Sequence, residues 1–269
     1  MTACTSLQPA EWVEAVEPAE SSVHDAPATR ADVHWVAVSS LAGSSAAWQH
    51  RIFPGKNPTA YQAIQLDGRS AIQSESSSAA SLLRQTLRIE PGALGNLRFS
   101  WKVPALINGA DLRERDSDDS PVRVVLAFEG DRSRFSAKNA MLSELVLLMT
   151  GEPLPYATLM YVWGNHSEPG SVVVNSRTDR IRKLVIESGP QALNRWLDYE
   201  RDIRADYEKA FGEEPGALVS IGLMTDTDNT RQQATAWYGP MTLLARPANR
   251  DSSPLATSPQ ANPAAGSKP

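Results

Sequence analysis

Three oxygen-bearing side chains, Asp226, Asp228 and Asn229, crowd the point where an apolar stretch of the chain ends. Residues 218–224 are apolar enough for a buried strand, and a second strand is expected over residues 236–244 after a short polar turn. Carboxylate and amide oxygens at a strand end are costly to bury unless a cation or hydrogen-bond donors satisfy them. The segment is therefore either a ligand-binding site or a structural anchor, and both alternatives stay open here.

A second acidic loop, containing Asp116, Asp118 and Asp119, precedes another strongly apolar stretch. Together with Asp226 and Asp228, these carboxylates form a candidate Ca²⁺ site, because Ca²⁺ takes oxygen ligands. Neither loop has the spacing of an EF-hand, so turn chemistry is an alternative, since Asp and Asn bond their own backbone in turns. Ion pairing is another alternative, and the nearby arginines are Arg113, Arg115, Arg123 and Arg231. No other cofactor is expected.

The two acidic loops are expected to meet in the folded chain. One loop comes before the apolar strand predicted over residues 122–129, and the other follows the strand predicted over residues 218–224. If these strands are antiparallel neighbours, the start of one lies beside the end of the other.

An aromatic stretch that ends in Trp163, Asn165 and His166 is a second candidate ligand site. A tryptophan at a strand edge can stack on a sugar ring, while the amide and the imidazole bond the hydroxyl groups of the sugar. The alternative is packing in the core, because sandwich cores bury tryptophan heavily, and this role is expected for Trp101 and Trp237.

The chain lacks the common catalytic motifs, and no residue is assigned a catalytic role. It has no Gly-x-Ser-x-Gly elbow, no His-Glu-x-x-His pair and no phosphate-binding glycine loop. A pair of carboxylates of the glycosidase kind, Glu75 or Asp116 with Asp226, is the remaining enzymatic alternative.

Short strand-like stretches recur between turn signals and are expected to position these residues. Many short strands separated by turns, with few helices between them, are typical of antiparallel sheets. The sequence therefore predicts a mainly β, jelly-roll-like antiparallel β-sandwich with one or two flanking helices. The helices are expected over residues 137–149 and 191–211, the second with Pro190 in its first turn and Gly212 after its end. The expected strands are 33–38, 61–66, 69–75, 81–89, 96–103, 122–129, 158–162, 171–174, 181–187, 218–224 and 236–244.

Composition and charge place these elements in one domain over residues 31–245. The chain has 269 residues, 41% of them hydrophobic and 21% charged, and a net charge of −5 with no basic run, which argues against a nucleic-acid surface. No apolar stretch approaches the roughly 20 residues of a membrane helix. Residues 1–30 and 246–269 are rich in Ala, Pro and Ser, which predicts a disordered tether and a disordered tail.

The single cysteine, Cys4, follows Met1, Thr2 and Ala3, as at the end of a bacterial lipoprotein signal. An apolar segment upstream is expected if the true start codon lies earlier. The alternative is a coincidental Ala-Cys near the terminus. The first interpretation predicts a lipid anchor on Cys4, with membrane association only through it, and a location in the periplasm or cell envelope; the second predicts the cytoplasm.

The body of the chain resembles a bacterial family known only as domain of unknown function 3047. The segments that carry the resemblance are 97–103, 109–119, 161–165, 185–189, Trp196, 206–207, 211–213 and 224–230. Members of that family commonly look like exported proteins, and the family carries no assigned activity. Residues 237–241, Trp-Tyr-Gly-Pro-Met, are more loosely similar to the closing strand of galactose-binding-like carbohydrate-binding jelly rolls.

These observations predict a non-catalytic binding module of the bacterial cell envelope, for a polysaccharide or another polar envelope ligand. A carboxylate-based hydrolase acting on a glycan and a structural envelope protein are the alternatives.

Overall fold

The computed structural model describes residues 33–34 and 48–246, which all belong to one compact unit of the chain, Asp32–Pro269. Cys4, the predicted tether and residues 247–269 of the predicted tail lie outside the described residues. Residues 35–38 of the first predicted strand also lie outside them. The predicted domain boundaries at residues 31 and 245 therefore stay predictions.

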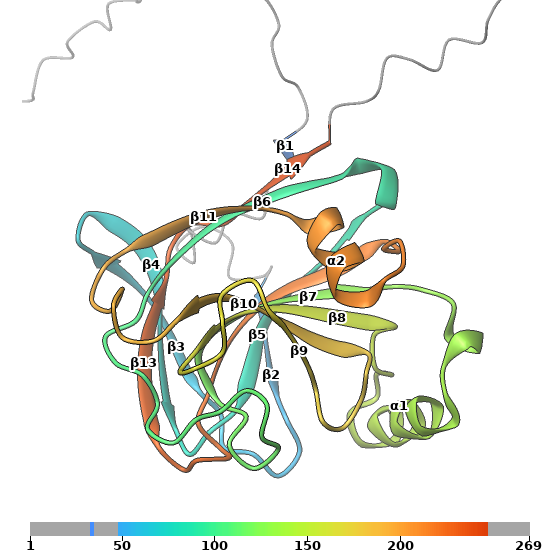
Figure 1. The fold of residues 1–269 in the computed structure, drawn as a ribbon, viewed down its shortest axis with the longest axis horizontal. Helices are drawn as coiled ribbons and strands as arrows, with labels where there is room; N and C mark the ends of the chain where they lie inside the picture. Colours follow the sequence, from blue (N-terminus) through green and yellow to red (C-terminus); the bar gives the residue numbers. More distant parts are fainter. Residues whose placement is uncertain (1–32, 35–47, 247–269) are drawn as a thin grey trace, which may run out of the picture. The chain divides into compact units, whose positions relative to one another are not determined.

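Seven strands form the first sheet, sheet A (Figure 1). Their order is β1 (Val33–His34), β14 (Thr242–Ala245), β6 (Leu94–Lys102), β13 (Gln233–Tyr238), β4 (Arg69–Ser77) and β3 (Ala60–Leu66), and β11 (Leu197–Asp202) also pairs with β6. The predicted hairpin between β3 and β4 is confirmed. Its turn residues, Asp67 and Gly68, both have positive φ angles, 54° and 75°, as a tight two-residue hairpin turn requires.

Seven strands also form the second sheet, sheet B. Their order is β2 (Trp48–Ile52), β5 (Ser81–Ile89), β12 (Leu218–Asp226), β7 (Ser120–Phe128), β8 (Ala157–Gly164), β10 (Ile181–Ser188) and β9 (Val172–Val174). Every pair of neighbours in this sheet is antiparallel except β8 and β10, which run parallel. The predicted β-sandwich is confirmed, with this one parallel pair as a difference.

The core lies between the two sheets and is rich in aromatic rings. Phe99 of sheet A stacks on Tyr161 of sheet B, with ring centroids 5.6 Å apart, and Trp101 faces Trp163 at 6.5 Å. All four side chains are at most 2% exposed, and they belong to one cluster of buried apolar residues. In both strands every second side chain enters this core: Leu97, Phe99 and Trp101 of β6, and Leu159, Tyr161 and Trp163 of β8.

The first predicted helix is confirmed as α1 (Ala137–Thr150), which begins after the capping side chain of Ser136 and ends at Gly151. Its buried residues are polar, Asn139 and Ser143, while Leu148 is 83% exposed. None of the described helices is both long enough and apolar enough to cross a membrane.

The second predicted helix is shorter than expected, and the prediction for residues 191–202 was wrong. Only α2 (Ile203–Phe211) is helical, and the preceding residues form β11. Leu197 and Tyr199 alternate with exposed residues, so this segment pairs with β6 instead of coiling. The side chain of Asp202 then accepts a hydrogen bond from the Ala205 N–H (3.0 Å), which fixes the helix start at Ile203.

Two further differences concern strands. The sequence did not predict β2, and the single strand predicted over residues 236–244 is divided into β13 and β14 by Gly239-Pro240-Met241. Gly239 lies so close to β6 that a Cβ atom there would be 2.1 Å from Ser100 Oγ. Pro240 has no N–H to donate, so the ladder is interrupted at this point.

The arrangement of β7 and β12 positions the candidate site. These strands are antiparallel neighbours, and Asp226 at the end of β12 pairs with Ser120 at the start of β7. Because successive side chains point to opposite faces of a sheet, Val122 and Val124 enter the core while Arg123 lies on the outer face of sheet B.

Candidate functional site

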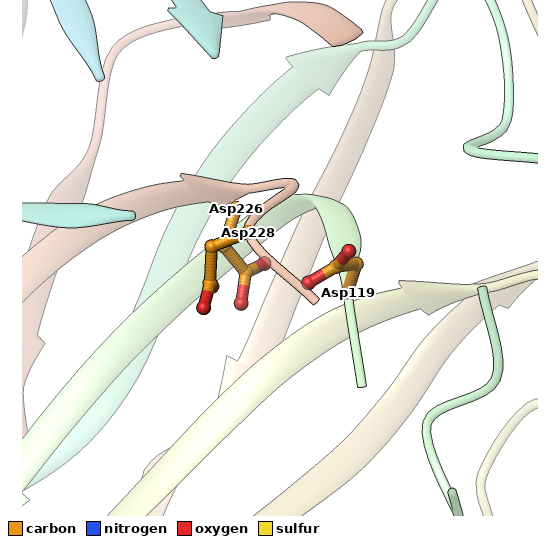
Figure 2. Close-up of side chains that lie close together, drawn as sticks. All are labelled: Asp119, Asp226 and Asp228. Carbon is orange, nitrogen blue, oxygen red and sulfur yellow. The ribbon is translucent and has the colours of Figure 1, made fainter. Parts of the chain in front are cut away.

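The two acidic loops meet, as the sequence predicted. Asp119 Oδ1 accepts hydrogen bonds from the backbone and side-chain nitrogens of Asn229, at 3.3 and 3.0 Å. Asp119 Oδ2 accepts from the backbone N–H and the hydroxyl of Thr230, at 2.7 and 2.6 Å. Figure 2 shows Asp119 opposite Asp226 and Asp228. The carboxylate of Asp119 therefore ties the loop after β12 to the start of β7.

Arg123 joins two of the other carboxylates. Its Nε donates to Asp226 Oδ1 at 2.9 Å, and its Nη2 donates to Asp118 Oδ1 at 3.1 Å. The side chains of Arg123 and Asp226 are only 4% and 6% exposed, so both groups have lost most of their hydration. Burial lowers the pKa of Arg123, but the two carboxylates raise it above its ordinary value, and the guanidinium stays charged.

Lys183 on β10 is the second buried cation. Its Nζ donates to Asp118 Oδ2 and to the backbone carbonyl of Leu112, both at 2.6 Å. Burial raises the pKa of Asp118, but Arg123 and Lys183 outweigh that effect and hold it below its ordinary value. Asp118 is therefore a carboxylate with a cation on each oxygen.

The cluster has one more carboxylate than cations: Asp119 pairs with no described cation, and Asp226 shares its cation, Arg123, with Asp118. Four carboxylates gather here, those of Asp118, Asp119, Asp226 and Asp228, while the cations paired with them are Arg123, Lys183 and Lys56, which pairs with Asp228. Burial raises the pKa of Asp226 to about 7 against the opposing effect of Arg123, and the charges of Asp119 and Asp118 add to the rise. Asp226 is thus half protonated near neutral pH.

A layer of buried hydroxyl groups supports the cluster from the core side. Thr225 lies between Met224 and Asp226 and points into the sandwich, where its hydroxyl bonds Ser74 (2.7 Å) and Tyr238 (2.9 Å). Thr227 bonds Ser76 at 2.9 Å in the same way. The Thr-Asp-Thr-Asp alternation therefore fixes the strand end from inside the core and presents Asp226 and Asp228 on the outer face.

A cavity of about 360 Å³ opens over the cluster. Asp226 Oδ1 is occupied by Arg123 and by the Ser120 N–H, while no described residue donates to Oδ2. Half-buried Phe53 provides an aromatic wall. The other polar lining residues are Lys56, Arg115, Asp118, Arg123, Asn175, Ser176, Arg177, Asp228 and Asn229.

The prediction that Trp163 stacks on a ligand was wrong. Its side chain is fully buried, and its Nε1 donates to the carbonyl of Gly189 at 3.0 Å, so no face of the ring is available. Asn165 is half-buried and donates to the carbonyl of Ile107 at 2.7 Å. His166 is exposed, and neither residue lines the cavity over Asp226.

The predicted pairing of Glu75 with Asp226 was also wrong, and Asp116 does not line the cavity over Asp226. Glu75 is exposed on β4, between inward-pointing Ser74 and Ser76, so it faces away from sheet B. Asp116 is exposed in its loop and does not belong to the group of three carboxylates formed by Asp119, Asp226 and Asp228.

Only part of the predicted metal set comes together. The carboxylate oxygens of Asp119, Asp226 and Asp228 lie within 4.8 Å of one another. However, all four lone-pair positions of the Asp119 carboxylate already accept hydrogen bonds, and Asp228 is paired with Lys56. This donor set suits a hydrogen-bonded and ion-paired cluster better than Ca²⁺.

Sequence reasoning did not find Lys183, Lys56, Phe53 or the two threonines of the Thr-Asp-Thr-Asp segment. The available signal for Lys183 was its position directly before the apolar residues Leu184, Val185 and Ile186 of its strand, because a charged residue buried there must find a partner. The alternation of Thr225 and Thr227 with the aspartates was the signal for a strand end with two different polar faces.

Comparisons with known proteins identify a family and distant similarities of fold. The family model described as "Protein of unknown function (DUF3047)" matches residues 46–242. No curated protein matches the chain.

Among solved structures, the xyloglucanase domain of NopAA, a type three effector from Sinorhizobium fredii in complex with cellobiose, is 10% identical. The match covers 74% of this chain and 93% of that one, with a TM-score of 0.40. A carbohydrate-binding module that recognises mannan, TmCBM27, is also 10% identical over 80% of this chain and 98% of its own, with a TM-score of 0.32. Similarity at this level carries no statement about ligand or reaction.

We predict that replacing Arg123 by methionine destabilises the protein by about 3–5 kcal/mol, because buried Asp226 loses its only cation and Asp118 loses one of its two. Chemical denaturation at pH 8 measures the loss. The control is Arg115→Ala, an exposed residue that lines the same cavity and pairs with no described carboxylate; its effect should stay within about 0.5 kcal/mol. Equal, small losses for both variants would contradict a buried ion-pair cluster.

The raised pKa of Asp226 predicts a pH dependence of stability. Because the folded state holds this proton more tightly than the unfolded state, the contribution of Asp226 is fully present below about pH 4 and is lost as the pH rises through about 7. The free energy of unfolding of the wild type should fall relative to that of Asp226→Asn over this window, by about 1.4 kcal/mol per unit of pKa difference. Parallel pH profiles for the two proteins would contradict the prediction.

The third prediction concerns calcium. Since the lone pairs of Asp119 are occupied, the thermal midpoint should be the same in calcium and in chelator. A bound ion would raise the midpoint with calcium concentration by mass action. Magnesium at equal ionic strength controls for general screening of charge, and a rise specific to calcium would restore the metal site.

Proposed function

The chain belongs to the family described as "Protein of unknown function (DUF3047)", and from this premise we propose that it is a non-catalytic binding module for a polyhydroxylated ligand, a glycan of the bacterial cell envelope. The proposed site is the cavity over Asp226, and the observation that carries the proposal is the mixed character of its lining. Cations, carboxylates, amides and one aromatic wall converge on a single opening.

Such a lining favours hydroxyl groups over a strongly charged ligand. A sugar hydroxyl both donates and accepts, so it can bond a carboxylate such as Asp228 and a guanidinium such as Arg177 in the same site. A polyanion would face the carboxylates, and a polycation would face Lys56, Arg115 and Arg177. Phe53 provides an apolar surface against which the C–H face of a sugar ring can pack.

Asp226 adds a group whose role changes with protonation. Asp226 lines the cavity, and its Oδ2 accepts no hydrogen bond from a described residue. With a pKa of about 7, this carboxyl donates to a ligand oxygen below neutral pH and accepts from a ligand hydroxyl above it.

Hydrolysis of a glycan is the second candidate function, because a glycosidase needs one protonated and one ionised carboxyl group in the same cavity. The pKa of Asp226 is raised and that of Asp118 is lowered. Asp226 has the raised pKa of a general acid, and Asp118 is a carboxylate. Both oxygens of Asp118 accept from cations, however, Oδ1 from Arg123 and Oδ2 from Lys183. A carboxylate neutralised in this way is a weak base and a weak nucleophile, so binding is the better-supported function.

We predict that a glycan array with bacterial envelope polysaccharides yields ligands whose affinity falls about tenfold in Phe53→Ala, the equivalent of 1.4 kcal/mol. The control is Glu75→Gln, which changes an exposed carboxylate on the outer face of sheet A and should leave affinity unchanged. Asp226→Asn should bind with an affinity that no longer varies around pH 7.

Turnover assays on the same glycans separate the alternatives. Binding without product supports the module, whereas product formation that Asp226→Asn abolishes would establish the hydrolase. The absence of both binding and product would leave a structural role in the envelope and overturn the proposal.

We also propose, from the position of Cys4 after Ala3, that the protein is lipid-anchored in the bacterial cell envelope. A single acyl chain binds membranes only marginally, so stable anchoring requires the several chains that a lipoprotein cysteine receives. Expressed with its native upstream DNA, the protein should fractionate with membranes and incorporate labelled fatty acid, and Cys4→Ser should release it. Soluble, unlabelled protein in both cases would contradict the anchor.

A further inference from the structure

Two arginines on neighbouring strands of sheet B share one carboxylate. Arg51 lies on β2 and Arg84 on β5, and the register of these antiparallel strands, with Arg51 opposite Leu82 and Arg84 opposite Gln49, places both arginines on the same face. Glu152, just after the end of α1, pairs with the Nη2 atoms of both, at 2.7 Å for Arg84. The group therefore has two positive charges and one negative charge.

Most of the hydrogen-bonding capacity of these two arginines is unused. The Nε atoms of Arg51 and Arg84 are buried without a hydrogen-bond partner, and no described residue accepts from either Nη1. Each guanidinium has five N–H donors in a fixed plane. Buried donors without an acceptor are costly, and a second acceptor between the two planes would relieve that cost.

The pair lines a cavity of about 860 Å³ that is separate from the one over Asp226 and shares no residue with it. The side chains of Arg51 and Arg84 are 40% and 20% exposed, so a ligand can reach them from the cavity. Arg88 and Arg132 also line it, but Arg88 already pairs with Glu90 and Glu129, and Arg132 donates to the Leu154 carbonyl. No described carboxylate pairs with Arg132, so the uncompensated positive charge at this cavity lies on Arg132 and on the Arg51–Arg84 pair, and only the pair has buried donors without a partner.

We propose that the Arg51–Arg84 pair is a binding site for an oxyanion, a carboxylate, sulfate or phosphate group of a ligand that occupies this cavity. The bound oxygens accept from the guanidinium nitrogens that Glu152 leaves free, and the planar fork of arginine suits them. The negative charge also removes the repulsion between two guanidinium groups, which together with burial lowers the pKa of Arg84.

The competing explanation is purely structural. Glu152 follows the αL residue Gly151 at the end of α1, so its pairing with two arginines also ties that helix to the edge of sheet B. The two explanations differ in what happens when the carboxylate of Glu152 is removed.

Calorimetric titration of the full chain with sodium phosphate, sodium sulfate and sodium glucuronate, each against sodium chloride at equal ionic strength, tests the proposal. We expect saturable binding of at least one of the three, and their ranking identifies a tetrahedral anion or a carboxylate as the preferred group. Arg51→Gln and Arg84→Gln should weaken it by at least about tenfold, the loss expected for a charged hydrogen bond. The matched control, Arg88→Gln, should retain wild-type affinity within about twofold.

Glu152→Gln provides the deciding variant, and it does not remove either arginine. If the site binds oxyanions, this variant should bind the preferred anion more tightly than the wild type, and that anion should restore the thermal midpoint that the substitution lowers. If Glu152 acts only as a tether, the midpoint falls and phosphate, sulfate and glucuronate restore it no more than chloride does. That outcome, or equal affinities in the wild type, Arg84→Gln and Arg88→Gln, would overturn the proposal.

Discussion

The buried guanidinium of Arg123 is the interaction on which the candidate site depends. A charge with 4% of its side chain exposed is stable only if its hydrogen bonds and its charge are satisfied locally, and Asp118 and Asp226 do both. Because Asp118 precedes β7 and Asp226 ends β12, the same group holds two distant parts of the chain together. Lys183 extends this clamp to β10, and Asp119 extends it to the loop after β12. Burial, together with the remaining imbalance of charge, explains why the carboxyl group of Asp226 keeps its proton up to about neutral pH.

The consequence for function is a rigid polar site on the outer face of a sheet. Thr225 and Thr227 anchor the end of β12 to the hydroxyl groups of sheet A, so Asp226 cannot move without breaking bonds inside the core. Groups that are fixed before the ligand arrives lose little entropy on binding, which favours recognition. Both oxygens of Asp118 accept hydrogen bonds from cations, Oδ1 from Arg123 and Oδ2 from Lys183. These bonds make the Asp118 carboxylate a weak base and a weak nucleophile. This arrangement supports the proposed binding role over the alternative of hydrolysis.

The sequence predicted those features that depend on local alternation and on the geometry of neighbouring strands. The sandwich, the β3–β4 hairpin, α1 and the meeting of the two acidic loops were predicted in this way. The features that depend on tertiary pairing were not. Trp163 occurs at a strand end, but which face of its strand enters the core is decided by the sheet opposite. Residues 197–202 fit a helix or a strand equally well until β6 is beside them. Lys183 requires a partner, but its partner, Asp118, is 65 residues away in the sequence.

The protonation of Asp226 tests the central claim most directly. Carbon-13 NMR of protein labelled at the aspartate carboxyl carbons follows each carboxyl group through a pH titration, and Asp226→Asn assigns the resonance. The account predicts that Asp226 titrates at about pH 7, because it is buried and shares its only cation, Arg123, with Asp118. It predicts that the pKa of Asp118 is below the ordinary aspartate value, because both Arg123 and Lys183 pair with it. An Asp226 midpoint at the ordinary aspartate value of about 3.9 would contradict it.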